Sequence, residues 1–307
     1  MENPTNQFTT EAIAQRPLAS PSHVGEPVFP QAVAASCATC GSMAANNEAT
    51  PPSYVYAIGK IEPRFPRVSV EKEFAQVIGR DNTSGLTDRQ ALHSVLSKPE
   101  NRYLARQMCW VMTIEGLETY IVYPRDPGDF GFLIESVRPL PSPMDIDVVV
   151  GLKGPIAKPE MCNSLTVPIV LFDQVYSFDR PSLINAIPRP DKIPAEEFAA
   201  TAEEVFDRIQ QMADNAGATD EHRALNYLAV RYPVIYATTA DAHGRNLSMT
   251  AVDVRPSLLS ATRKIVDVVF TFTNRATDVK EKSFVRVDVT EEFPFLVNKL
   301  TPYYDRY

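Results

Sequence analysis

Two kinds of hydrophobic spacing alternate along the chain after residue 52. Residues 54–61 are mostly β-branched or aromatic and lie between prolines and charged positions, which is typical of a strand. Residues 198–212 instead carry apolar side chains at i, i+3 and i+4, and this spacing predicts a long helix that Pro194 opens. Strand and helix patterns both occur repeatedly after residue 52, so the sequence predicts an α+β fold with mixed or antiparallel sheets and several packed helices.

Polar residues mark where several of these elements begin. Thr87 and Gln90 have the spacing of a capping box ahead of an apolar helical run, and Asp126 precedes Pro127 as an N-cap precedes a first turn. Thr219 is expected to cap a helix that continues to residue 230. Further strands are predicted at residues 110–114, 119–123, 145–150, 165–172, 234–238, 247–254, 264–273 and 284–289, further helices at residues 70–78 and 91–96, and a solvated hairpin turn at residues 278–282.

The first 52 residues have a different composition. They are poor in charge, rich in Ala, Pro, Ser and Thr, and interrupted by prolines from Pro4 to Pro52. Such a segment buries too little apolar area to offset the entropy lost on ordering, so residues 1–52 are predicted to be a mobile tail that carries a C-x-x-C knuckle. Residues 53–307 are predicted to be the α+β domain, and the pattern leaves open whether it has two lobes that meet near residue 190.

Charge and glycine content exclude several classes of ligand. The chain has 30 Lys and Arg against 38 Asp and Glu, a formal charge of -8, so it offers no general electrostatic surface for nucleic acid. It has only 12 glycines and contains neither a P-loop motif nor G-x-G-x-x-G. Neither nucleic-acid binding nor nucleotide binding is expected.

The sequence also predicts a location. Glu2, Glu11 and Arg16 interrupt the apolar run that a secretory signal peptide needs, and the most continuous apolar run, residues 167–172, is too short to span a bilayer. We therefore expect a cytoplasmic protein without a membrane span.

The sequence gives little indication of a hydrolase. Residues 41–44 resemble a fragment of the serine loop of subtilisin-type proteases, in which the catalytic order is Asp, His, Ser. The first aspartate of this chain is Asp81, which follows Ser42, so that triad is not expected. Asp145 and Asp147 are an example of the acidic pairs that could serve as an acid/base couple or hold Mg²⁺, although the polar face of a strand explains such a pair more simply.

The cysteines carry the sharpest chemical signal. Cys37 and Cys40 form the C-x-x-C knuckle, and with Cys109 and Cys162 they supply the four soft ligands that a structural Zn²⁺ takes. In a reducing compartment disulfides are rare, so the four cysteines are expected to be thiols or metal ligands. Two alternatives remain open: Cys109 as a small buried residue, and redox chemistry at the knuckle.

Several long blocks resemble one known family. These blocks lie at residues 54–66, 71–75, 86–92, 100–106, 110–123, 125–127 and 160–163. They are similar to the C-terminal domain of PatA/PatG-type cyanobactin maturation proteases, from about the knuckle to at least Pro190 and more loosely to the C-terminus. In that family the domain is fused to subtilisin-like protease domains in clusters that make ribosomal, post-translationally modified peptides, and it has no established activity of its own.

The resemblance implies an accessory binding or scaffolding module that acts in trans with a subtilisin-like protease or with a modified-peptide system. The alternative is an enzyme of unrecognised mechanism that acts on a peptide. Aromatic residues crowd the C-terminus, among them Phe293, Phe295, Tyr303 and Tyr304, and Arg306 lies beside them. Since aromatic and Arg side chains anchor interfaces, we expect a homodimer or a protease partner to use this end of the chain.

Overall fold

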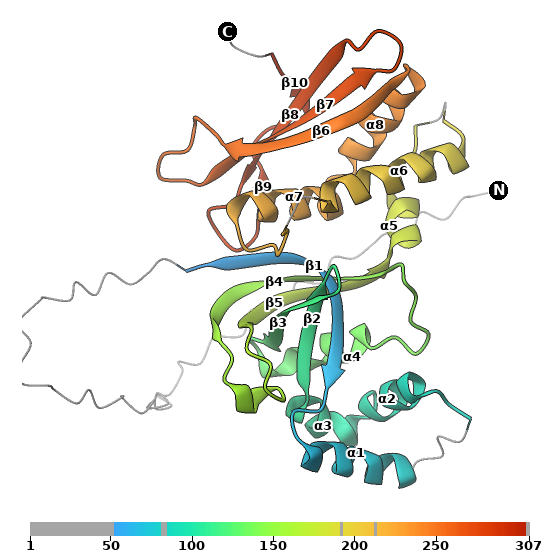
Figure 1. The fold of residues 1–307 in the computed structure, drawn as a ribbon, viewed down its shortest axis with the longest axis vertical. Coiled ribbons are helices and arrows are strands. Elements are labelled where there is room, and N and C mark those ends of the chain that lie inside the picture. Colours follow the sequence, from blue (N-terminus) through green and yellow to red (C-terminus); the bar gives the residue numbers. More distant parts are fainter. Residues whose placement is uncertain (1–51, 81–84, 191–192, 212–213, 305–307) are drawn as a thin grey trace, which may run out of the picture. The chain divides into compact units, whose positions relative to one another are not determined.

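Five strands in the first half of the described chain close into a barrel (Figure 1). The computed structural model describes residues 52–80, 85–190, 193–211 and 214–304. The predicted tail and its knuckle therefore lie outside the described residues. The barrel strands are β1 (Tyr54–Arg64), β2 (Cys109–Ile114), β3 (Leu117–Pro124), β4 (Asp145–Ile156) and β5 (Pro168–Asp179).

The strands follow the order β1-β2-β3-β5-β4, and β4 pairs with β1 to complete the circle. Only the β3–β5 pair is parallel among the strand pairs described for the barrel. This is a five-stranded Greek-key barrel, the architecture of OB-folds. Alternate residues of each strand face the barrel core: Val55, Ala57 and Ile61 of β1 pack there with Met112 and Trp110 of β2.

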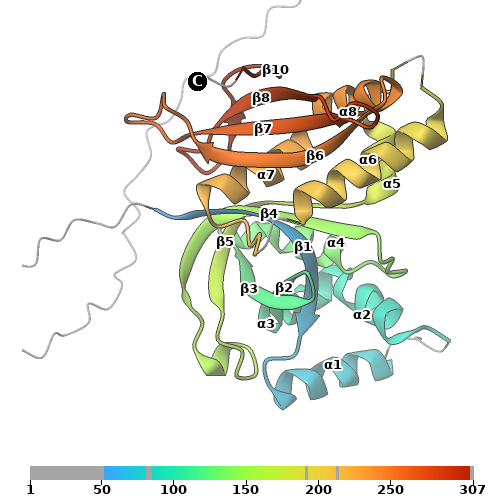
Figure 2. The ribbon, with the colours of Figure 1, turned by 45° about the horizontal axis from the view of Figure 1, so that its top comes forward.

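Helices cover one end of the barrel (Figure 2). They are α1 (Val68–Arg80), α2 (Asp88–Leu96) and α3 (Arg102–Gln107), in the β1–β2 connection, and α4 (Phe130–Ser136), between β3 and β4. The predicted capping box is confirmed, because the Thr87 hydroxyl accepts from the Gln90 N–H while the Gln90 side chain accepts from the Thr87 N–H. Asp126 caps a 3-10 turn, η2 (Pro127–Asp129), that leads into α4.

The second half forms a helical layer and a sheet. The helices are α5 (Arg180–Ala186), α6 (Ala195–Gln210), α7 (Asp220–Arg231) and α8 (Val234–Gly244); the strands are β6 (Leu247–Pro256), β7 (Ile265–Asn274), β8 (Lys280–Asp288), β9 (Phe295–Leu296) and β10 (Thr301–Pro302). The sheet is antiparallel with the order β10-β8-β7-β6, and β9 also pairs with β8. Helices α6 to α8 lie between this sheet and the barrel (Figures 1 and 2). The predicted α+β class with mixed and antiparallel sheets is confirmed.

The helical layer shares its core with the barrel wall. Tyr56 and Ile58 of β1 and Ile146, Val148 and Val150 of β4 point outward and pack with the apolar faces of the helices and the sheet. The backbone of Tyr56 also bonds the barrel wall to the second half of the chain. Its N–H donates to Gly217 O at 2.9 Å, and its carbonyl accepts from Asn226 Nδ2 at 2.8 Å. The described residues all belong to one compact unit.

One local prediction was wrong, and two had wrong bounds. Residues 234–238 begin α8 and not a strand: Ile235 and Tyr236 are buried, but the exposed Val234 and the half-buried Ala237 are also apolar, so no helical period is visible in the sequence. The predicted turn at 278–282 overlaps β8, which already begins at Lys280; charged side chains are tolerated at this exposed end of the strand. The strand predicted at 165–172 is β5, but it begins at Pro168, and the residues before it belong to the β4–β5 connection. None of the helices in the described ranges has the length and apolar character needed to cross a membrane.

Candidate binding cleft

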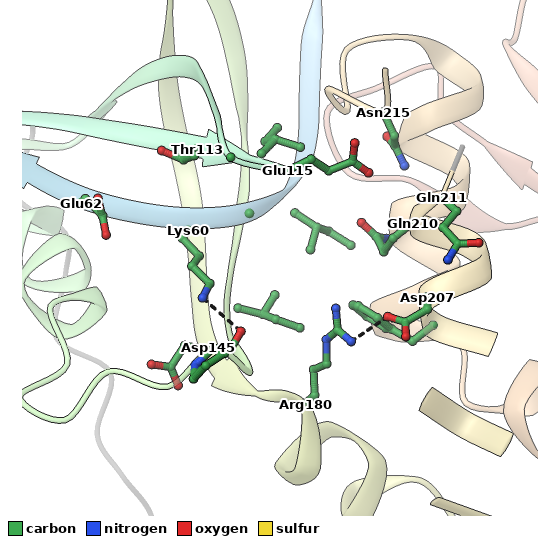
Figure 3. A pocket seen from close by; sticks show the side chains of 17 residues that line it. Lys60, Glu62, Thr113, Glu115, Asp145, Arg180, Asp207, Gln210, Gln211 and Asn215 are labelled. Carbon is green, nitrogen blue, oxygen red and sulfur yellow. Dashed lines mark hydrogen bonds and ion pairs between the residues drawn. The ribbon is translucent and has the colours of Figure 1, made fainter. Parts of the chain in front are cut away.

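A cleft of about 510 Å³ lies between the barrel wall and the helical layer (Figure 3). Strand β1, the β2–β3 turn and the start of β4 form one side, and α5, α6 and the α6–α7 connection form the other. The apolar part of the lining consists of Ile58, Ile114, Ile146 and Phe206. The cleft therefore has an apolar lining, with polar side chains from both walls around it.

A glycine brings the barrel wall into position. A Cβ at Gly59 would lie 2.4 Å from Thr113 O, so only glycine allows β1 and β2 to approach this closely beside the cleft. The next residue, Lys60, donates from Nζ to Ser142 O at 3.3 Å and to Pro143 O at 3.0 Å. Lys60 thus ties β1 to the segment that leads into β4, and its ammonium lies at the lower edge of the cleft in Figure 3.

The β2–β3 turn carries a carboxylate to the opposite edge. Glu115 and Gly116 have φ values of +49° and +84°, the consecutive left-handed pair that a two-residue hairpin turn requires. The Glu115 side chain is exposed and extends toward the helical layer, near Gln211 and Asn215 (Figure 3). The structure gives its carboxylate no hydrogen bond or ion pair with any described residue.

The helical wall presents one ion pair and several amides. Arg180 Nη1 donates to Asp207 Oδ1 at 2.6 Å, and the guanidinium stacks over the Phe206 ring, 5.0 Å from its centroid. Gln210 Nε2 donates to Asn226 Oδ1 at 3.4 Å, whereas the exposed side chain of Gln211 has no hydrogen bond to the described residues. Arg180 is therefore held rigidly, and the side chain of Gln211 remains available to a ligand.

Few charged groups of the described cleft lining are without a partner. Glu62 and Asp145 pair with Arg89 and Arg138, so most charged groups of the lining already have partners. The described residues that line the cleft include no His, Cys or Ser, the side chains that most often act as base or nucleophile. Amide groups around an apolar lining are suited to the alternating polar and apolar groups of an extended peptide.

The structure brings two of the four predicted metal ligands together. Cys109 of β2 and Cys162, which follows the 3-10 turn η3 (Pro159–Met161), form a disulfide with a Cα–Cα distance of 5.5 Å, and both residues are buried. This differs from the expectation of free thiols, because the β4–β5 connection folds over β2 and β3 and places the two sulfurs in contact. Cys37, Cys40 and Ser42 lie outside the described residues. Within the described part of the chain, no group of three or more His, Cys, Asp and Glu side chains is arranged to hold a metal ion.

The disulfide holds a cover over the β2–β3 side of the barrel. Val111 and Ile121 pack there against Ala157 and the two cysteines, and Met161, Leu165, Val167 and Ile169 complete the cluster. OB-fold barrels commonly bind oligonucleotides and oligosaccharides on this side. Here the chain itself occupies it, so the candidate cleft is on a different side.

The predicted acidic pair has a structural role. Asp147 is 4% exposed and accepts from the Ile61 N–H at 2.7 Å and from Ser177 Oγ at 2.6 Å. Burial raises the pKa of Asp147, and these hydrogen bonds oppose the rise. Asp145 pairs with Arg138 and accepts from the Ser142 N–H at 2.7 Å. The pair therefore organises the start of β4, and Asp147 is not on a wet face.

A second acidic pair, which the sequence pattern does not indicate, links the barrel to the β8–β9 segment. Arg125 Nη2 lies 2.9 Å from Asp173 Oδ2 and 3.3 Å from Glu292 Oε2, so one guanidinium serves two carboxylates. Burial, and then the neighbouring Asp173, raise the pKa of Glu292 to about 7. Buried Arg223 of α7 fixes the Glu292 backbone, since its guanidinium donates to the carbonyls of Val289 and Glu292 at 2.8 and 3.2 Å.

The comparisons with known proteins point to one kind of domain. Residues 192–303 match the family model described as PatG C-terminal. A solved structure, "PatG Domain of Unknown Function", superimposes with a TM-score of 0.64 at 18% identity over 82% of this chain and 98% of that chain. The search of the curated proteins found no match. The family match lies after all of the resembling blocks, the last of which ends at residue 163, whereas the structural match covers most of the chain.

Proposed function

Because the chain carries a PatG C-terminal-type domain, we propose that it is an accessory binding module that acts in trans with a subtilisin-like protease or with a modified-peptide system. Its ligand is an extended peptide segment, which occupies the cleft between β1 and α6. The proposal places the module in the cytoplasm. The protein is expected to show no peptidase activity of its own.

The cleft lining carries this proposal. Most of its charged side chains already have partners, while the side chains of Gln211 and Glu115 project from opposite walls without a described partner. An extended peptide has amide groups along both edges and side chains that alternate between two faces. Its backbone can therefore bond to the polar edges of the cleft while one side chain contacts the apolar lining.

Site-specific photocrosslinking tests the proposal. A photoreactive phenylalanine analogue at Gln211 should capture a peptide or protease that is encoded beside this gene. The same analogue at Gln76, an exposed glutamine of α1, should not capture it. Capture should be lost in Arg180→Glu, which reverses the charge of one cleft edge. Equal capture from both positions would contradict the proposal.

The alternative is an enzyme that acts on a peptide, and one observation favours it. The Glu115 carboxylate extends beside the cleft without a described partner, as a general base would. Turnover of a peptide that Glu115→Gln abolishes, while Glu118→Gln retains it, would establish this alternative. Binding without turnover supports the accessory module.

A structural zinc site is a separate part of the proposal. As a disulfide, Cys109 and Cys162 cannot act as thiolate ligands; reduction would leave two thiols side by side, and Cys37 and Cys40 would complete a four-sulfur set. Full-length protein purified with a thiol reductant should then contain one zinc per chain by elemental analysis. Cys37→Ser should lose the metal. A reduced protein without zinc would refute this part and leave the cleft proposal intact.

A further inference from the structure

The C-terminal sheet has one face that no helix of the described residues covers (Figures 1 and 2). Val285 and Val287 of β8 point to the helices and are fully buried, so Phe284, Arg286 and Asp288 point away from them. The strand register places Asp267 of β7 and Arg255 of β6 on this same face. We call it the outer face.

Cations stack on aromatic rings across the outer face. Arg255 and Lys282 lie 5.1 and 6.0 Å from the Tyr303 ring centroid, although they come from β6 and β8. Arg286 lies 4.9 Å from the Phe284 centroid, and the two rings meet edge to face at 5.5 Å. Arg263 of the β6–β7 loop adds a further pair, 5.2 Å from the centroid of Phe295. The outer face therefore consists largely of Arg and aromatic groups, the side chains that anchor interfaces.

Two of these arginines are held in place by ion pairs with carboxylates of the sheet. Arg286 Nε bonds to Asp267 Oδ1 at 3.0 Å, and Arg263 pairs with Asp288, whose side chain is 1% exposed. The side chain of Arg263 is itself 52% exposed. Stacking and ion pairing have already fixed these guanidinium groups, so a partner that binds them loses little side-chain entropy.

The outer face also differs in charge from the chain as a whole. Its cations are Arg255, Arg263, Lys280, Lys282 and Arg286, and its carboxylates are Asp253, Asp267 and Asp288. Among the described residues of this face positive charge is therefore in excess, whereas the whole chain has a formal charge of -8. Apolar surface lies beside these cations, because Phe295 is 47% and Val297 40% exposed.

We infer that the outer face binds an acidic segment of a partner protein, one that places an apolar side chain against Phe295 and carboxylates near the fixed arginines. This surface is separate from the cleft. A polyanion such as nucleic acid fits less well, because the carboxylates of the face and the negative charge of the whole chain repel it. A two-fold dimer through the same face would bring like charges together.

Selection from a library of short random peptides tests the inference on the full chain. Peptides bound by the wild-type protein should be enriched in Asp and Glu, and should include an apolar residue. The double variant Arg263→Gln/Phe295→Ser, which removes a fixed arginine and the ring that it stacks on, should weaken their binding by at least about tenfold, as the loss of an interface anchor does. The matched control, Val68→Ser/Lys72→Gln, changes an exposed apolar residue and an exposed cation of α1, and should alter binding less than about twofold.

Several outcomes would overturn the inference. Selected peptides that are neutral or basic would do so, as would binding that the double variant leaves unchanged. A labelled single-stranded oligonucleotide that competes with the peptides and binds more tightly would favour nucleic acid. A concentration-dependent doubling of mass that the double variant abolishes would favour a second copy. If the double variant does not fold, Phe295→Ser alone, at an exposed site, provides the comparison.

Discussion

Gly217 is the residue at which the α6–α7 connection meets the barrel wall. Its φ is +70°, and a Cβ there would lie 2.3 Å from Tyr56 O. Gly217→Ala should therefore lower the free energy of unfolding by about 3 kcal/mol or more, since it adds both backbone strain and a clash with backbone atoms that cannot move independently.

Urea denaturation measures this effect, and a matched glycine provides the control. Gly79 lies in α1, and no atom lies within 4 Å of the Cβ that an alanine would add there. Gly79→Ala should leave stability unchanged or raise it by up to about 1 kcal/mol, because alanine favours helix. Equal effects at the two positions would show that the contact of Gly217 with Tyr56 does not matter.

Glu292 should make stability depend on pH. Its ordinary pKa is 4.5 and its folded pKa is about 7, so between these values the folded state retains a proton that the unfolded chain releases. Stability should consequently fall as pH rises through this interval. In Glu292→Gln that part of the pH dependence should disappear, and the variant should be at least as stable as the wild type near pH 8. Thermal unfolding at a series of pH values measures it.

The neighbouring exposed residue gives the control for Glu292. Glu291→Gln removes the same charge from the same segment without touching the Asp173–Arg125 contact. It should retain the pH dependence of the wild type. A flat profile for Glu291→Gln, or an unchanged one for Glu292→Gln, would contradict the assignment.

At the scale of elements, the β4–β5 connection depends on one covalent link. The Cys109–Cys162 disulfide closes a separation of 53 residues and keeps the connection on β2 and β3. Reduction in the presence of a chelator should lower the free energy of unfolding by about 2–4 kcal/mol and expose residues 157–167 to proteases. Urea denaturation and limited proteolysis, with and without reductant, measure both effects.

Cysteine variants distinguish this link from other effects of the reductant. Cys162→Ser should reproduce the loss of stability, and reductant should change that variant no further. Cys37→Ser/Cys40→Ser should respond to reductant as the wild type does. If Cys162→Ser is as stable as the oxidised wild type, the disulfide does not hold the connection.

Elements that have a local cause could be predicted from the sequence. The capping box at Thr87 could be predicted because the hydrogen bonds that form it join near neighbours in the sequence. Helix α8 was missed because Val234 and Ala237, which lie off its buried face, are apolar like the buried Ile235, so the sequence does not show a helical period. The disulfide was missed for a similar reason: nothing local brings Cys109 and Cys162 together.

At the scale of the whole molecule, the family match covers a segment that should not fold alone. Residues 192–303 contain helices α6 to α8 and the sheet, yet their core includes Tyr56, Ile58 and Val148 of the barrel wall. A fragment of residues 192–303 would expose this apolar surface and should lack a cooperative thermal transition, whereas residues 53–307 should unfold in one step. Calorimetry of both fragments checks this, and an independent transition of the shorter fragment would contradict it.

The cleft could not be predicted for a related reason. Ile58 and Ile114 have the pattern of core residues, and Gln211 that of a solvated helix end. Only the tertiary arrangement places them around one cavity. The α+β class and the PatG resemblance were confirmed because they rest on patterns within continuous blocks, whereas a site built from six separate segments leaves no such pattern.

The shared wall of β1 and β4 also restricts how such a protein can diverge. Each outward residue of this wall, such as Tyr56 or Val150, must fit the helical layer, while its neighbours in sequence must fit the barrel. Exchange of one half for the homologous half of a relative at low identity would therefore mismatch two cores at once. Recombination in nature, or the design of chimeras in the laboratory, should succeed when the barrel and the helical layer are transferred as one cassette.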